Sequence, residues 1–323
     1  MNRLCLAALI VAAAAAAACP SPDDVGFEVA LVTPGPVTDA GWNAAAFAGL
    51  DAIGERLAAT TAHAEASSPA EFEEAFRAFA ARGAELVFGH GFEFQDAALT
   101  VAAEYPQSAF AVTSGLAVSD NVAGVVFRLE EAAYLAGVLA AGVSDSGVTG
   151  MVGGMEIPPV RLVFDGYRRG FLDARPDGVV KEVYIGGWED AAAGRQAALS
   201  LIGQGADVVL QDADAAGLGV FQACRERGVW AIGSNADQSD AAPGVVLASA
   251  TMDIPEAMVR VAEDVAGGSF QGGLYVFDLA SGLVELVMNP ALAENVPSEV
   301  RDALTEAHSA VVDGTVDLAH FGE

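Results

Sequence analysis

Residues 27–43 read FEVALVTPGPVTDAGWN, and this stretch introduces the structural unit that the rest of the chain repeats. Residues 27–32 form a short apolar run that ends at the breaker cluster Thr33-Pro-Gly-Pro, which is typical of a buried strand. From residue 42 to 57, apolar residues recur at helical spacing. The stretch therefore predicts a strand, a loop and a helix, the repeating unit of an α/β sheet.

Outward from this stretch, apolar runs alternate with helical segments. Ser68-Pro-Ala-Glu71 is a capping box with proline at the first helical position, so it predicts the start of a helix. Residues 274–277 and 283–287 are predicted to form a hairpin around residues 280–282. Further strands are predicted at 85–88, 109–112, 122–127, 148–152, 179–184, 207–210, 229–232 and 245–248.

The series of strands and helices begins again at residue 148, so the chain holds two series of similar length. A chain of 323 residues also exceeds the size at which one hydrophobic core stops growing. We therefore expect two lobes, each a doubly wound parallel sheet flanked by helices. The N-terminal lobe is predicted to comprise residues 26–125 with about 250–280, and the C-terminal lobe residues 126–248 with about 281–315.

The chain is strongly acidic, with 44 Asp and Glu against 15 Lys and Arg and a net charge of −29. This balance excludes a nucleic-acid-binding protein and a polybasic membrane patch, since both need a basic surface. The excess acid predicts a solvated acidic surface, with a cationic ligand as the less favoured interpretation.

The first residues are typical of an export signal. Arg3 precedes an apolar run at 4–18, and small residues precede Cys19. Residues 1–18 are therefore predicted to be a signal peptide of lipoprotein type, with Cys19 as the lipidated residue. A cleaved form without lipid is the alternative. The mature protein is expected at the periplasmic face of a bacterial membrane.

The loops after the predicted strands carry the candidate ligand contacts, because ligands of such sheets bind at the carboxyl ends of strands. Trp42 and Trp188 stand in loops of different lobes and could hold a flat ring between them. Each tryptophan could instead pack in a core. Asp212, Asn235 and Asp237 follow two strands and could bind ligand hydroxyls or amines, or could simply stabilise turns.

Signatures of catalysis are weak. The four histidines are far apart and lack metal-ligand spacing, and no nucleophile elbow, phosphate-binding loop or Cys-x-x-Cys pair occurs. A hydrolase that uses His90 with Glu93 is the least favoured interpretation. We therefore expect neither an enzyme, nor a cofactor, nor a bound metal.

The chain resembles the basic-membrane-protein family of substrate-binding lipoproteins, the nucleoside-binding components of bacterial ABC importers. The resemblance covers roughly residues 26–315. It rests on an ordered set of segments: 39–43 (DAGWN), 89–92 (GHGF), 131–137 (EAAYLAG), 152–155 (VGGM), 203–207 (GQGAD) and 232–238 (IGSNADQ). The resemblance implies a two-lobed type I periplasmic-binding fold that encloses its ligand at a hinge and performs no catalysis.

The resemblance also implies a set of site residues. Trp42 stands where an aromatic residue lines the base pocket, Asn43 would read the base edge, and Trp188 would stack on the opposite face. The complete predicted ligand-binding set is Asp39, Trp42, Asn43, Phe92, Ser114, Trp188, Asp212, Asn235, Asp237 and Met252.

Three residues depart from the family's pattern. Nucleoside binders usually carry acids where this chain has Ser114 and Asn235, and a lysine near Met252. Those groups grip ribose hydroxyls, so their loss weakens the case for ribose. A free purine base or another flat heterocycle becomes as plausible as a nucleoside.

These observations predict a monomeric, lipid-anchored binding protein that delivers a purine-like small molecule to an ABC permease and its ATPase. The alternative is a periplasmic sensor with the same fold, which would present its closed form to a signalling partner. A neighbouring pair of permease and ATPase genes would favour the importer.

Overall fold

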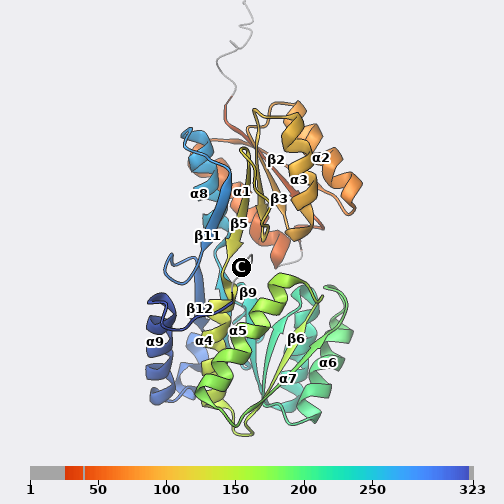
Figure 1. Ribbon diagram of the computed structural model, residues 1–323. Coiled ribbons are helices and arrows are strands. Elements are labelled where there is room, and N and C mark those ends of the chain that lie inside the picture. The colour runs from red at the N-terminus through yellow and green to blue at the C-terminus, as the bar shows by residue number, and fades with distance from the viewer. Residues whose placement is uncertain (1–25, 39–40, 320–323) are drawn as a thin grey trace, which may run out of the picture.

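The computed structural model describes residues 26–38 and 41–319, and Figure 1 shows them as two lobes, one above the other. The predictions for Cys19 and Asp39 lie outside these residues. Each lobe is built on a six-stranded sheet. The predicted α/β architecture, two parallel-dominated sheets flanked by helices, is confirmed.

The first sheet has the strand order β11-β5-β4-β3-β1-β2, and every pairing between these strands is parallel. Three of its inner strands, β3, β4 and β5, are buried along their whole length, as expected for a sheet covered on both faces. The strands are β1 (Glu28–Thr33), β2 (Thr60–Glu65), β3 (Leu86–His90), β4 (Ala109–Thr113), β5 (Val122–Phe127) and β11 (Gly273–Phe277). The helices around it are α1 (Trp42–Leu57), α2 (Pro69–Ala81), α3 (Gln95–Glu104) and α8 (Ile254–Ala266) (Figure 1).

The second sheet has the order β12-β10-β9-β8-β6-β7 and is parallel except for β12, which runs antiparallel to β10. Its strands are β6 (Val148–Gly153), β7 (Val179–Tyr184), β8 (Val208–Asp212), β9 (Trp230–Asn235), β10 (Val246–Met252) and β12 (Val284–Met288). The helices of this lobe are α4 (Leu129–Val143), α5 (Pro158–Ala174), α6 (Ala191–Gly203), α7 (Gly217–Arg227) and α9 (Ser298–Val312) (Figure 1).

The first five strands of each lobe follow the same order, with the second strand at one edge, then the first, third, fourth and fifth. In such a sheet the connections reverse direction between the first and third strands, and ligands bind in the crevice outside their carboxyl ends. The first lobe has this switch point between β1 and β3, and the second between β6 and β8.

The chain passes between the lobes after β5, after β10 and between β11 and β12. These passages are hydrogen bonded to one another. Arg128 N donates to Phe277 O at 2.8 Å, and Asp253 N donates to Leu283 O at 2.7 Å. Each passage leaves a strand at its carboxyl end, so the carboxyl edges of both sheets adjoin this hinge.

One sequence expectation about strands is wrong, and one strand was not predicted. The predicted hairpin does not form, because β11 pairs with β5 in the first sheet and β12 pairs with β10 in the second. A hairpin turn and a short passage between lobes have the same local pattern, so only the pairing partners distinguish them. Strand β2 was missed because its sequence, TTAHAE, is polar and lies at a sheet edge.

The division of the chain into two discontinuous lobes at the predicted boundaries stays a prediction. The sheet memberships support it, since β11 returns to the first sheet and β12 to the second. All of β10, through Met252, belongs to the second sheet, so the passage to α8 begins after that residue.

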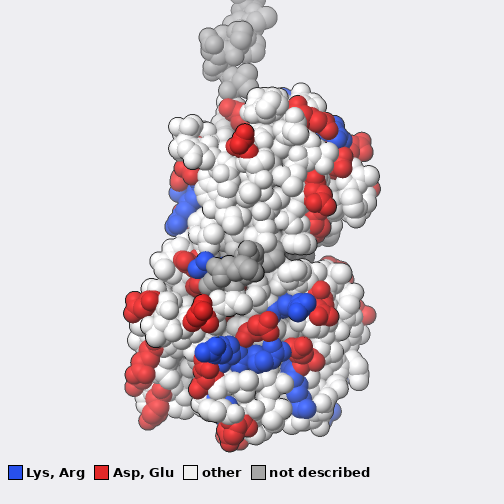
Figure 2. Space-filling model, in the orientation of Figure 1, with Lys and Arg blue, Asp and Glu red and all other residues white. Residues whose placement is uncertain are grey.

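The two lobes differ in how charge is distributed over their surfaces. In the face shown in Figure 2, acidic side chains are scattered over both lobes, whereas basic side chains gather on the lower lobe. Helix α5 of that lobe carries Arg161, Arg168 and Arg169. Each of these three arginines is paired with a neighbouring carboxylate, so their positive charge is locally neutralised.

Candidate functional site

Trp42 is the first residue of α1 and lies beside the switch point of the first sheet. Its ring stacks on His90, the last residue of β3, with ring centroids 4.1 Å apart and an interplanar angle of 26°. Nε2 of His90 donates to the Trp42 carbonyl oxygen at 2.9 Å, and Nδ1 contacts the Thr113 hydroxyl at 2.8 Å. His90 is fully buried, so it serves as a fixed support beneath Trp42.

Asn43 is buried next to Trp42, with its side-chain nitrogen against the backbone of Gly35. The Thr33 hydroxyl donates to Gly35 O at 2.7 Å and contacts Nε2 of His63 at 2.9 Å. These bonds hold the start of the loop between β1 and α1. These bonds and the burial of Asn43 fix the described residues on either side of residues 39–40.

Phe92 and Ser114 follow the next two strands of the first lobe. Phe92 opens a short 3-10 helix and is half-buried. Ser114 comes directly after β4 with a φ of +53°. A non-glycine residue in the left-handed region costs free energy, and such residues gather at functional sites.

Trp188 lies in the second lobe, in the loop between β7 and α6. Its ring lies directly over Gly154, where an added Cβ would be only 2.1 Å from Trp188 Cε3. The carbonyl oxygen of Trp188 accepts a hydrogen bond from Ala216 N at 2.8 Å, which ties its loop to the segment after β8. Trp188 therefore lies over the carboxyl ends of β6 and β8, the switch point of the second sheet.

Asp212 is the last residue of β8 and is only 4% exposed. Its Oδ1 accepts hydrogen bonds from the Ser234 hydroxyl at 3.1 Å and from Asn235 Nδ2 at 3.3 Å. Burial raises the pKa of Asp212 to about 6, and these two hydrogen bonds partly oppose the rise. The structure thus brings Asp212 and Asn235, both predicted from the sequence, into direct contact.

Backbone strain accompanies these residues. Asn235 and Asp214 also have positive φ values, +70° and +51°, so with Ser114 they account for three of the four non-glycine residues with positive φ in the described chain. The fourth, Ala58, caps the end of α1. The surrounding fold holds strained residues at the strand ends where the other candidates lie.

Two residues of the predicted ligand-binding set, Asp237 and Met252, make contacts different from those expected of ligand-binding residues. Asp237 is exposed, and its Oδ1 accepts bonds from the backbone and hydroxyl of Ser239, which is the turn-stabilising role that the sequence left open. Met252 ends β10, pairs with Val284 and is half-buried beside the hinge.

Sequence reasoning missed the supporting residues of the site. The sequence marks His90 only as the centre of the hydrolase interpretation, and no local pattern predicts its stacking on Trp42. Gly154 stands in the segment 152–155, which belongs to the family resemblance. The close approach of Trp188 explains that glycine, and the signal was the pair Gly153-Gly154 immediately after an apolar run.

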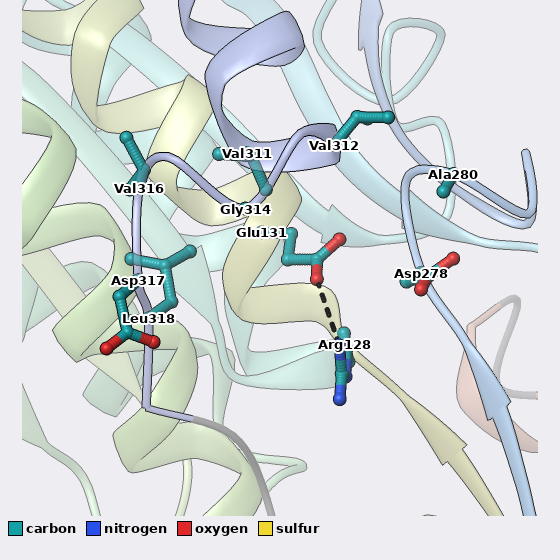
Figure 3. Close-up of a pocket in the computed structure, with 10 residues that line it drawn as sticks. All are labelled: Arg128, Glu131, Asp278, Ala280, Val311, Val312, Gly314, Val316, Asp317 and Leu318. Carbon is teal, nitrogen blue, oxygen red and sulfur yellow. Dashed lines mark ion pairs between the residues drawn. The ribbon is translucent and has the colours of Figure 1, made fainter.

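A separate cavity of about 190 Å³ lies at the hinge, between the passages and the segment after α9 (Figure 3). Glu131 in its wall accepts a hydrogen bond from Leu279 N at 2.9 Å and lies 3.8 Å from the Arg128 guanidinium. Burial raises the pKa of Glu131. None of the predicted ligand contacts lines this cavity, which belongs to the hinge rather than to the candidate site.

No described helix is long and apolar enough to cross a membrane. Nor do three or more His, Cys, Asp or Glu side chains converge within the described ranges to form a metal site.

Comparison with known proteins gives a family. The family model described as ABC transporter substrate-binding protein PnrA-like matches residues 27–313. The chain is 29% identical over 305 residues to the ABC transporter nucleoside-binding protein BmpA of Lactococcus lactis, covering 87% of this chain and 86% of that protein. It is 26% identical over 294 residues to a purine-binding protein of Brucella abortus, covering 90% and 82%.

A solved structure shows the same fold. The solute-binding protein of an ABC transporter system from Aeropyrum pernix matches with a TM-score of 0.83 at 24% identity, over 92% of this chain and 94% of that one. The predicted periplasmic-binding fold is confirmed. Because the family model spans nearly all described residues, the chain belongs to the Bmp family of PnrA-like ABC transporter substrate-binding proteins.

Proposed function

We propose that this protein binds a purine-like flat heterocycle between its lobes and delivers it to an ABC permease. The observation that carries the proposal is the placement of Trp42 and Trp188. Each lies at the switch point of its own sheet, and the carboxyl edges of both sheets adjoin the same hinge. Closure about that hinge would bring the two indole rings onto opposite faces of one ligand.

Family membership supports the transport role. The Bmp family consists of extracytoplasmic substrate-binding proteins, which take a small molecule and pass it to permease partners. The names of the relatives in Lactococcus lactis and Brucella abortus, nucleoside-binding and purine-binding, favour an aromatic nitrogen heterocycle as the ligand. A pair of tryptophans is well suited to such a ring, since stacking on an aromatic side chain is worth about 1–3 kcal/mol per base.

The surroundings of His90 favour binding over catalysis. A general base must reach the proton that it removes. His90 is fully buried, and both ring nitrogens contact groups of the protein itself. The ring therefore holds Trp42 in place, and the hydrolase interpretation loses its central residue.

The preference for base or nucleoside follows from the polar residues. Ser114, Asn235 and Met252 stand in place of two acids and a lysine that, in the family's pattern, bind the ribose hydroxyls. A ribose hydroxyl that is buried without a partner costs about 1–3 kcal/mol. We therefore expect nucleosides to bind no more tightly than the corresponding free bases. Asp212 is the residue best placed to compensate for the lost acid, because it contacts Asn235.

The test is calorimetric titration of the wild type, Trp42→Ala and Trp188→Ala with adenine, adenosine, guanine and guanosine. Each substitution should weaken binding by about 1–3 kcal/mol, or about 5- to 150-fold, while thermal stability falls much less. Trp230→Phe is the matched control, because Trp230 is the first residue of β9 and so lies at the amino end of the strand, away from the carboxyl ends that form the candidate site.

Normal binding by both alanine variants together with early unfolding would show that the tryptophans only pack in the core. A tenfold preference for a nucleoside over its base, about 1.4 kcal/mol, would show that the ribose contacts have been replaced. An uptake assay in cells distinguishes the importer from the sensor. Deletion of the gene should abolish uptake of the labelled ligand only if the protein delivers that ligand to a permease.

A further inference from the structure

The loops that follow the strands of the second sheet are acidic, and of their acids Glu156 pairs with Arg161 of α5. In the sequence, residues 154–157, 185–190, 212–217 and 235–245 contain no lysine or arginine. They contain seven acids: Glu156, Glu189, Asp190, Asp212, Asp214, Asp237 and Asp240. A crevice lined by a single sign of charge concentrates ligands of the opposite sign.

Asp212 is the buried member of this set, and it has no cationic partner. None of the ion pairs in the described chain involves it, and both of its side-chain hydrogen bonds come from the neutral groups of Ser234 and Asn235. Both of those bonds end on Oδ1. An ionised carboxylate that is buried without a cation is costly, so a ligand that supplies positive charge there gains free energy.

An aromatic surface covers the end of the strand that neighbours Asp212. Asp212 pairs with Gly153 in the neighbouring strand, and its carbonyl oxygen accepts a hydrogen bond from Gly154 N at 2.9 Å. The Trp188 ring covers Gly154. Tryptophan is the best cation–π partner among the aromatic side chains, and the attraction grows when the site excludes water.

We propose that this site selects a flat cationic nitrogen heterocycle, with Trp188 stacked on the ring and Asp212 as its counter-ion. The inference rests on the proposed function, because it concerns the same site, and it makes Asp212 the residue that determines charge specificity. Met252, where the family's pattern has a lysine, adds no positive charge that would oppose such a ligand.

The test uses two pairs of probes that differ chiefly in charge. The first pair is 1-methylnicotinamide, a permanent cation, and neutral nicotinamide. The second is 1-methyladenosine, a cation at neutral pH, and its neutral isomer N6-methyladenosine. Calorimetric titration of the wild type should show the cation of each pair binding at least about tenfold more tightly, which is ~1.4 kcal/mol.

Asp212→Asn keeps the shape of the side chain and removes its charge. This variant should lose most of the preference for the cation, so the ratio of the two affinities within each pair should fall toward one. Asp237→Asn is the matched control, because Asp237 is exposed and its side chain bonds to Ser239. The control should retain the wild-type preference.

A second measurement on the wild type covers the case in which Asp212→Asn fails to fold. Lowering the pH to about 5 should reduce the affinity for 1-methylnicotinamide and spare nicotinamide. Burial raises the pKa of Asp212, the hydrogen bonds from Ser234 and Asn235 oppose the rise, and no charged neighbour contributes to it. The other acids of these loops are Glu156, Glu189, Asp190, Asp214, Asp237 and Asp240. The pH effect should therefore disappear in Asp212→Asn wherever that variant folds.

The outcomes separate the two proposals. If neutral purines bind while the cations bind no more tightly, or if Asp212→Asn weakens both members of a pair equally, the charge inference is wrong and the proposed function stands. If no base, nucleoside or cationic heterocycle binds the wild type, the proposed function itself fails.

Discussion

Replacing Gly154 by alanine should displace the Trp188 ring and weaken ligand binding without unfolding the protein. A Cβ at this position would lie 2.1 Å from Cε3 and 2.3 Å from Cζ3 of Trp188, whereas carbon atoms pack at about 3.5–4.0 Å. The ring must therefore move by more than about 1 Å. Because Trp188 is half-buried on a loop, its side chain can move while the sheet beneath stays in place.

The expected magnitude follows from what the displaced ring contributes. Loss of one stacking face costs about 1–3 kcal/mol, so affinity for the tightest-binding purine or cationic probe should fall by about 5- to 150-fold. Titration calorimetry measures the affinity, and thermal unfolding measures the stability. Gly187→Ala is the matched control, because it lies one residue before Trp188 and an added Cβ there meets nothing within 4 Å. Equal affinities for the two variants would refute the assignment of Trp188 to the site.

Three further predictions test the site, the packing and the membrane anchor. Because burial raises the pKa of Asp212 to about 6, above the ~3.9 of an unfolded chain, its ionised form destabilises the fold. The free energy of unfolding of the wild type, measured in urea and compared with that of Asp212→Asn, should fall by on the order of 2–3 kcal/mol as the pH rises from about 4 to above 6. A difference between the two proteins that does not change with pH would contradict this. Gly170→Ala should destabilise the protein by about 1–3 kcal/mol or more, because the new Cβ would lie 1.9 Å from Tyr134 O, where α5 packs on α4. Gly203→Ala is the control and should be tolerated, because its Cβ would meet nothing within 4 Å. Cys19→Ala should move the protein from the membrane fraction to the soluble fraction, and a wild type that is already soluble and carries no lipid mass would contradict the anchor.

Local signals in the sequence determined most of the elements. The capping box was one, since Ser68 does cap α2 and accepts a hydrogen bond from Glu71 N at 3.4 Å. The stretch at 27–43 also forms the strand, loop and start of helix that its pattern predicts. These features depend on residues within one turn or one strand of each other, so backbone propensity and periodicity are sufficient to identify them.

The tertiary structure determined which strands pair and which distant residues come into contact. The pattern around residues 280–282 was compatible with a hairpin, yet β11 and β12 enter different sheets because each finds its partner far away in the sequence. The contact of Asp212 with Asn235 likewise depends on the order of β8 and β9, and the packing of Trp188 on Gly154 depends on the loop after β7 folding back over β6. The sequence by itself determined the elements and the kinds of residue at the strand ends. Only the pairing of distant strands, which no local pattern encodes, determined how those residues meet.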